Sequence, residues 1–189
     1  MPEIKRGSFS INLGLFQLQA DVSEEDRQCA WELYTEICTR RSLTGRAGDE
    51  TCADFTGEVL AEGLDSVHTF FREARGIMRR FPVGRLPGQS KHLGVLINAL
   101  MVNVLRPFLE KWQADFRHWW QTEARTEASP FERQKLYPHY QEFVEDWRNV
   151  RLLMRDLLEK LREWYKLTDV TCVQNDSPGG SQNAGLHIA

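Results

Sequence analysis

An almost charge-free apolar run in the second half of the chain limits the possible folds more than any other feature. The run extends from Leu93 to Leu105 and ends at Arg106 and Pro107. It is shorter than the roughly 20 residues that a membrane-spanning helix needs, and it contains Asn98 and Asn103. We therefore predict no membrane span but a core helix, which the apolar faces of other helices must cover.

Other segments show the three- and four-residue apolar spacing of amphipathic helices. Proline and glycine interrupt the pattern at residues 81–90, and Ser129-Pro130 interrupts it again. The expected helices cover residues 23–41, 54–80, 90–121, 131–136 and 138–167. Four of them are long, and about ten residues of loop suffice to join antiparallel neighbours. The pattern predicts an all-α fold, an antiparallel four-helix bundle.

The N-terminal segment has a different, two-residue alternation. Residues 8–22 alternate apolar and polar side chains, but the apolar parity switches between Leu15 and Phe16. A bulge or turn near Gly14 would explain the switch, so we expect a short strand or hairpin. Residues 168–175 are a candidate short strand to pair with it. The resulting division is 1–22 extended segment, 23–167 helical bundle and 168–189 short strand and flexible tail.

Composition narrows the class of function. The 189 residues are 27% charged and 41% hydrophobic, with a net charge of −3. A protein that coats nucleic acid would carry a basic excess, so nucleic acid is not favoured as a partner, although a local basic patch stays open. The four cysteines form no paired metal or disulfide pattern, and the first ten residues have no apolar signal core. We predict a cytoplasmic protein.

The polar residues of the apolar helix allow two interpretations. Pro107 has no N–H to bond the carbonyl of Asn103, which predicts a bend. Asn98 and Asn103 would, if buried, need hydrogen-bond partners and would fix the packing of the helix in one arrangement. The alternative is a polar pocket at the bend, in which Asn98, Asn103 or Arg106 faces a ligand or a partner.

Aromatic side chains follow the apolar run. Trp112, Phe116 and Trp119 have the spacing of one helix face, and we predict them in the core. Trp120 points elsewhere, on the side of Arg117. Because tryptophan is a favoured anchor in protein interfaces, Trp120 is a candidate contact residue.

Signatures of catalysis are weak. The sequence has no phosphate-binding loop, dinucleotide fingerprint or nucleophile elbow, so we expect no cofactor. Asp-x-x-His occurs at Asp65/His68 and Asp115/His118, but the core stripes offer almost no carboxylates to complete a dimetal site. We expect no metal site.

One catalytic pattern resembles this chain loosely. HEPN-type helical ribonucleases carry an arginine followed, after four to six residues, by a histidine. Arg85/His92 and Arg133/His139 have this spacing. In such a site the histidine would act as general acid or base, and the arginine would stabilise charge on the phosphate.

Three segments carry a further resemblance: EDRQCAWELYTEICTR, LDSVHTFFREARGIMRRF and LINALMVNVLRPFLEKW. They resemble an uncharacterised family of small bacterial helical proteins with AWELY-type and LNxVLRPFLxKW-type segments. The family is similar to accessory components encoded in bacterial conflict or antiphage neighbourhoods and implies no catalytic motif. Val102 stands where the pattern has asparagine, and Asn103 follows it. The matching residues are Trp31, Glu32, Tyr34, Arg106, Pro107 and Trp112.

These observations favour a non-enzymatic helical module that binds another protein, as an accessory component of a bacterial defence system. The contact would involve Trp120, the helix near Pro107, or a free edge of the N-terminal strand. Trp112, which matches the pattern of the resemblance, belongs to the same candidate set. A HEPN-like ribonuclease or nucleic-acid-binding effector is the alternative, and a small-molecule sensor with a pocket near Asn98 and Asn103 is a third. Assembly into a homo-oligomer stays open.

Overall fold

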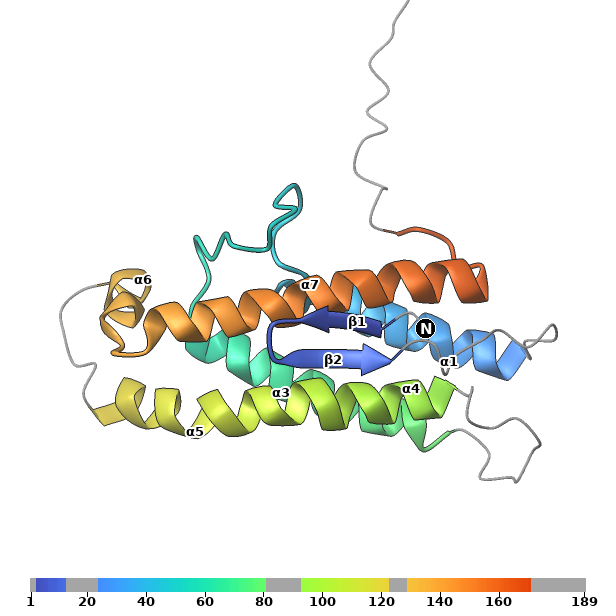
Figure 1. Cartoon of the computed structure of the whole chain (residues 1–189), viewed down its shortest axis with the longest axis horizontal. Helices are drawn as coiled ribbons and strands as arrows, with labels where there is room; N and C mark the ends of the chain where they lie inside the picture. The colour runs from blue at the N-terminus through green and yellow to red at the C-terminus, as the bar shows by residue number, and fades with distance from the viewer. Residues whose placement is uncertain (1–2, 13–23, 81–92, 123–128, 171–189) are drawn as a thin grey trace, which may run out of the picture.

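The structure is a computed structural model that describes residues 3–12, 24–80, 93–122 and 129–170. Within these ranges the chain is mostly helical, with a two-stranded antiparallel hairpin at its N-terminal end (Figure 1). The prediction of a helical fold with a short N-terminal β element is therefore confirmed.

The described elements are two strands followed by a series of helical segments. The strands are β1 (Glu3–Arg6) and β2 (Phe9–Asn12). The helical elements are α1 (Glu24–Cys38), α2 (Arg41–Thr44), α3 (Leu60–Met78), α4 (Leu93–Leu100), the π-helical segment η3 (Met101–Leu105), α5 (Arg106–Thr122), α6 (Pro130–Arg133), the 3-10 turn η4 (Gln134–Leu136) and α7 (Tyr140–Tyr165).

The second long helix begins later than the apolar spacing predicts. Residues 54–59 form turns, and α3 starts only at Leu60. Gly57 adopts a φ of 74°, which a helix cannot contain, and the Asp54 carboxylate accepts a 2.8 Å hydrogen bond from the Thr56 N–H. The expected helical start at Asp54 is wrong because this local turn competes with the helix.

The hairpin turns at Gly7 and Ser8, where Gly7 has a φ of 57°. Its strands pair Arg6 with Phe9 and Ile4 with Ile11. The switch of parity that we placed near Gly14 lies outside the described residues. Residues 168–170 form no strand, and the rest of the expected C-terminal strand is also outside the described residues.

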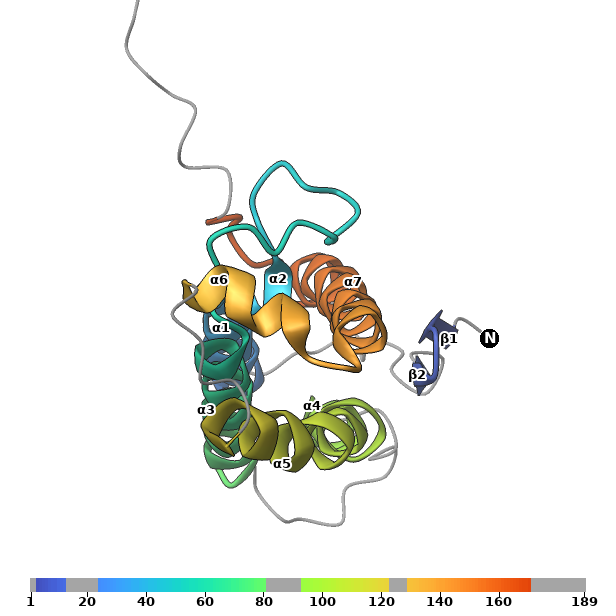
Figure 2. The same ribbon diagram turned by 90° about the vertical axis from the view of Figure 1, so that its left-hand side faces the viewer.

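The helices and the hairpin form layers. Seen end-on, α7 and the α4–α5 helix stand one above the other, with α1 and α3 on one side of them and the hairpin on the other (Figure 2). β1 runs alongside α7, and β2 runs alongside η3 (Figure 1). The more specific prediction of an antiparallel four-helix bundle stays a prediction.

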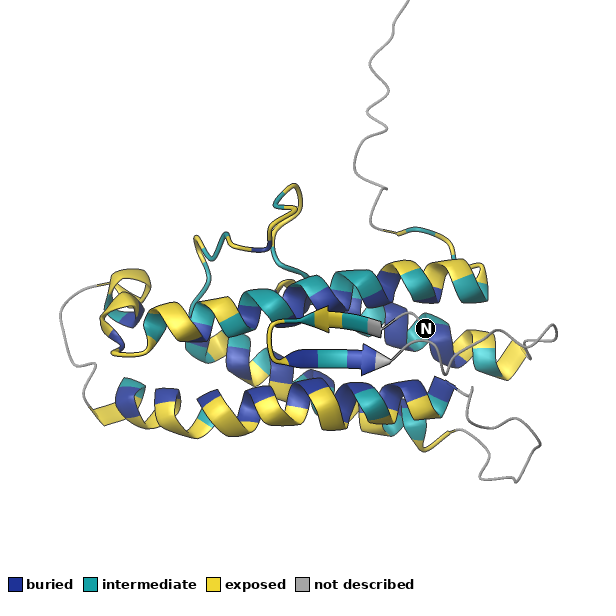
Figure 3. Ribbon diagram, viewed as in Figure 1, coloured by how far each residue is buried: buried dark blue, intermediate teal, exposed yellow. Residues whose placement is uncertain are grey.

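The core lies where the buried faces of α1, α3, the α4–α5 helix, α7 and the hairpin meet, and its part between α5, α7 and the hairpin is rich in aromatic rings (Figure 3). The Phe143 ring centroid lies 5.0 Å from that of Trp112 and 5.2 Å from that of Trp147. Phe9 of the hairpin meets the edge of Phe108 at 6.3 Å. The predicted core stripe of α5, which is Trp112, Phe116 and Trp119, is confirmed as buried.

Pro107 is accommodated by a π-helical turn within a continuous helix. The Arg106 N–H donates to the carbonyl of Met101, five residues earlier, where an α-helix would use the fourth. Such a turn widens the helix by one residue immediately before the proline. A π-turn therefore lies where we predicted a bend around Asn103–Pro107, and the bend itself stays a prediction.

The helix from Leu93 to Thr122 is long and apolar enough, by length and composition alone, to cross a membrane. Half of its most apolar window is buried inside the protein. A covered core helix passes the same test, so this single helix is weak support for a membrane span.

Two glycines of α3 give a matched stability test. A Cβ added to Gly63 would lie 2.6 Å from Cη2 of Trp147, whereas one added to Gly76 would meet no atom within 4 Å. We expect Gly63→Ala to lower the free energy of unfolding by about 1–3 kcal/mol through overpacking. Gly76→Ala should raise it by about 0.5–1 kcal/mol, because alanine has the higher helix propensity.

Urea denaturation monitored by circular dichroism measures both effects. Stabilisation by both substitutions would contradict the close approach of α3 to Trp147.

Candidate functional site

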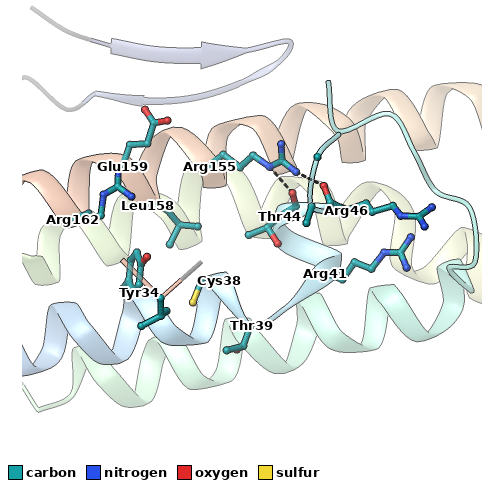
Figure 4. A pocket seen from close by; sticks show the side chains of 14 residues that line it. Tyr34, Cys38, Thr39, Arg41, Thr44, Arg46, Arg155, Leu158, Glu159 and Arg162 are labelled. Carbon is teal, nitrogen blue, oxygen red and sulfur yellow. Dashed lines mark hydrogen bonds between the residues drawn. The ribbon is translucent and has the colours of Figure 1, made fainter. Parts of the chain in front are cut away.

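Two cavities of similar size compete as the functional site. The first, of about 720 Å³, lies where α1, α2 and the following loop face the C-terminal half of α7 (Figure 4). Its labelled polar lining includes Tyr34, Cys38 and four arginines. Four guanidinium groups around one cavity would ordinarily indicate an anion site. Those arginines are Arg41, Arg46, Arg155 and Arg162.

The arginines of this first cavity already have partners. Arg155 donates to the carbonyls of Thr44 and Asp49 at 2.6 Å each and to that of Arg46 at 2.9 Å. Figure 4 shows two of these bonds. Arg41 pairs with Glu58 at 3.1 Å, and Arg162 pairs with an aspartate. The guanidinium groups therefore hold the loop in place and offer little to an anion.

Arg151 lies behind this cavity and is completely buried. It pairs with Glu58, its Nε donates to the carbonyl of Ser42 at 3.4 Å, and its guanidinium lies 4.0 Å from the centroid of Phe55. Its Nη1 has no hydrogen-bond partner within the described ranges. Burial lowers the pKa of Arg151, and the charge of Glu58 opposes that change. The group is structural, since it joins α7 to α2 and to the loop before α3.

The cysteine of the first cavity is a poor nucleophile. Burial raises the pKa of the Cys38 thiol above its usual value. Since the thiolate is the reactive form, Cys38 is held in its unreactive state near neutral pH. The arginines of this cavity therefore serve to hold the loop, and its thiol is not suited to catalysis.

The second cavity is an open groove of about 740 Å³ between α3 and the α4–α5 helix. Apolar side chains from both helices lie along it, and polar side chains stand at its rims. The apolar lining residues are Phe71, Met78, Met101, Val102, Leu109 and Ala114. The polar and charged lining residues are His68, Arg75, Asn98, Arg106, Glu110, Gln113 and Arg117.

The groove has cations on both walls. Arg75 of α3 and Arg106 of α5 are exposed, and within the part of the chain that the structure describes neither guanidinium group forms an ion pair or a hydrogen bond. Arg117 is exposed and pairs with Asp65. Glu110 is the acidic residue of the lining. Unpaired guanidinium groups next to apolar surface are suited to binding an acidic, partly apolar ligand.

The π-turn aligns the polar residues of the α4–α5 wall. In a regular α-helix, residues eight apart differ by about 80° around the axis, so Asn98 and Arg106 would diverge. The wider turn at η3 absorbs an extra residue and reduces that offset. Asn98, Val102 and Arg106 therefore follow one another along the same groove.

The asparagines are not buried. Asn98 and Asn103 are both exposed, so the interpretation that they fix the packing of a buried helix is wrong. The α4–α5 helix is covered on the sides facing α3 and the hairpin, and its outer face remains open. Asn98 and Arg106 line the groove, whereas Asn103 and Pro107 are exposed beside it. Their role in binding stays a prediction.

The two candidate tryptophans differ in accessibility. Trp112 is 3% exposed and donates from Nε1 to Asp146 at 3.0 Å, so it belongs to the core and cannot be an interface contact in this state. Trp120 is half-buried, because the guanidinium of Arg133 lies 3.6 Å from its ring centroid and Phe116 stacks on it at 5.9 Å. Its expected contact role stays a prediction.

The ribonuclease pattern gains no geometric support. Arg85 and His92 lie outside the described residues. Arg133 covers Trp120, and its buried Nε has no partner in the described part of the chain. His139 is exposed at the N-terminus of α7, against the edge of Tyr137. Neither residue lines the two cavities.

The Asp-x-x-His pairs have other partners. Asp65 pairs with Arg117, and Asp115 accepts a hydrogen bond from the Tyr137 hydroxyl, whose pKa is raised by burial and by that carboxylate. In the residues that the structure describes, no group of three or more His, Cys, Asp or Glu side chains could hold a metal ion.

Sequence reasoning missed parts of the groove that depend on packing. Which helix lies across the groove from α3 could not be read from the sequence. Val102, 39% exposed, was counted as part of a buried run. The four-residue steps from Asn98 to Val102 and from Val102 to Arg106 were an available signal, but the π-turn that brings all three residues into line was not predicted.

Comparisons of the chain with protein-family models, with curated proteins and with solved structures give no match. The resemblance to a family of bacterial helical proteins stays a prediction.

The buried arginine gives a test of the first cavity. We expect Arg151→Met to lower the free energy of unfolding by about 3–5 kcal/mol, because it leaves Glu58 without its buried partner. Arg148→Met is the control: Arg148 donates to the Thr51 carbonyl at 2.8 Å but is only partly buried, and its loss should cost about 1 kcal/mol.

Hydrogen exchange by mass spectrometry should show the loss of protection in residues 45–59 for Arg151→Met. Equal effects of the two substitutions would contradict a special role for the buried guanidinium.

Proposed function

We propose that this chain is a non-enzymatic protein-interaction module and that the groove between α3 and the α4–α5 helix is its docking surface. The observation that carries the proposal is that Arg75 of α3 and Arg106 of α5 line the same groove together with apolar side chains, and that neither guanidinium group has a partner among the described residues. Isolated exposed cations need no partner, but cations that border apolar surface on both walls match the composition of a binding groove.

The chemistry of the two cavities supports a binding role. In the first cavity, the guanidinium group of Arg155 donates hydrogen bonds to loop carbonyls, and the thiol of Cys38 has a raised pKa. The second has an amide, two unpaired guanidinium groups and apolar side chains, which can orient a ligand. Its open shape suits an elongated segment of another protein.

Three finer predictions belong to this proposal. The long helices would form an antiparallel four-helix bundle that serves as a rigid support for the groove. The protein would act in the cytoplasm, and it would be an accessory component of a bacterial defence system. The resemblance of the three quoted sequence segments supports the last of these.

Site-specific cross-linking tests the proposal. The photoreactive residue p-benzoylphenylalanine is introduced at Val102 in the groove and, in a second variant, at Phe131, which does not line the groove; the two side chains are 39% and 42% exposed. Illumination in the native cells should give a discrete protein adduct from Val102 only. Adding Arg106→Glu should reduce that adduct about tenfold, equivalent to about 1.4 kcal/mol.

Mass spectrometry identifies the adduct. The same adducts from both positions, an adduct that Arg106→Glu leaves unchanged, or no protein adduct at Val102 would contradict the proposed docking surface.

A further inference from the structure

We infer that the occupant of the groove is an amphipathic helix with acidic residues on both sides of its apolar stripe. This inference rests on the proposed function and adds the chemistry of the partner.

The apolar lining of the groove favours a partner helix with an apolar stripe. Phe71 and Met78 come from α3, and Met101 and Leu109 come from the facing helix. Val102 also lines the groove and is 39% exposed. Two parallel helical walls with an apolar floor form the kind of surface in which a third helix lays its apolar face.

The arginines on the two walls of the groove favour a docked helix that has acidic residues on both flanks. Arg75 stands on one wall and Arg106 on the other, and neither has a partner within the described residues. A helix lying between them would present its two flanks to the two guanidinium groups, as the charged flanks of a coiled coil meet across an apolar seam. Acidic side chains on both flanks would pair with both arginines. Basic flanks would be repelled by both.

The size of the groove fits a short helix. Its lining on α3 extends from His68 to Met78, which corresponds to about 15 Å at the 1.5 Å rise of an α-helix. About three turns of a docked helix would cover this length. Such a helix offers two or three apolar positions to the floor and one or two acidic positions to each wall.

The same surface is less suited to nucleic acid. Glu110 lies in the lining between Arg106 and Arg117, where it would oppose a phosphate backbone. Arg117 is already paired with Asp65. The apolar floor would gain nothing from a phosphate chain, and the protein as a whole has a net charge of −3.

A display library tests the inference with the full chain. Its members are 18-residue amphipathic helices with a fixed leucine stripe and with Glu, Gln or Lys randomised at the flanking positions. Selection on the unmodified protein should enrich Glu over Lys at the flanks by about fivefold or more. Selection on Arg75→Glu/Arg106→Glu should reverse the preference to Lys.

A variant with the same change of charge away from the groove is the control. Lys5→Glu/Lys166→Glu changes two exposed lysines that do not line the groove, and it should keep the preference for Glu. Circular dichroism and a thermal melt establish that both double variants fold. Competition with a single-stranded RNA 20-mer should leave the selected peptides bound.

The outcomes separate the two proposals. No preference for Glu, a preference that survives the groove reversal, or displacement of the peptides by RNA overturns the acidic-helix inference. If Val102 still cross-links a partner in cells, the docking surface stands and only the chemistry of its occupant is wrong. Selection of Glu-flanked helices without a cellular adduct at Val102 supports the acidic-helix inference but contradicts the proposed function.

Discussion

The completely buried guanidinium of Arg151 constrains the polar half of this fold more than any other group. A cation removed from water is tolerated only where charges and hydrogen-bond acceptors replace its hydration. Glu58 supplies the charge, the carbonyl of Ser42 supplies an acceptor, and the face of Phe55 covers the group. These partners come from α2 and from the loop before α3. Arg151 therefore fixes the end of that loop against α7. Arg155 holds its beginning through backbone carbonyls.

Trp147 links this polar network to the apolar core. Its Nε1 donates to the Ser42 carbonyl at 2.7 Å, the same acceptor that Arg151 uses. Its ring lies 5.5 Å from Phe108, and Gly63 of α3 leaves room for the far edge of that ring. One indole thus sets the position of α2 through its nitrogen and the distance of α3 through its ring. A change in packing on either side would be transmitted to the other.

The parts of this fold that sequence reasoning could predict are those that depend on local spacing. The long helices and the core stripe of α5 followed from apolar periodicity, because residues three and four apart lie on the same face of a helix and are buried together. The start of α3 was missed, because the turn at Gly57 competes with the helix. Arg151 could not be told from a surface arginine, since its partner Glu58 is 93 residues away. The exposure of Asn98 was missed because it depends on which helix faces the hairpin and α3 leave uncovered.

The contrast between the two arginine-lined cavities carries the functional argument. In the first cavity, the guanidinium group of Arg155 bonds loop carbonyls, so its donors are not available to a ligand. In the groove, the guanidinium groups of Arg75 and Arg106 are exposed and have no partner among the described residues, and apolar side chains line the same groove. A ligand that covered the groove without acidic groups would remove water from two cations and give them no hydrogen-bond acceptor in its place, which would cost binding free energy. Any tight occupant must therefore bring negative charge to both walls, and its binding should weaken as salt screens these exposed pairs.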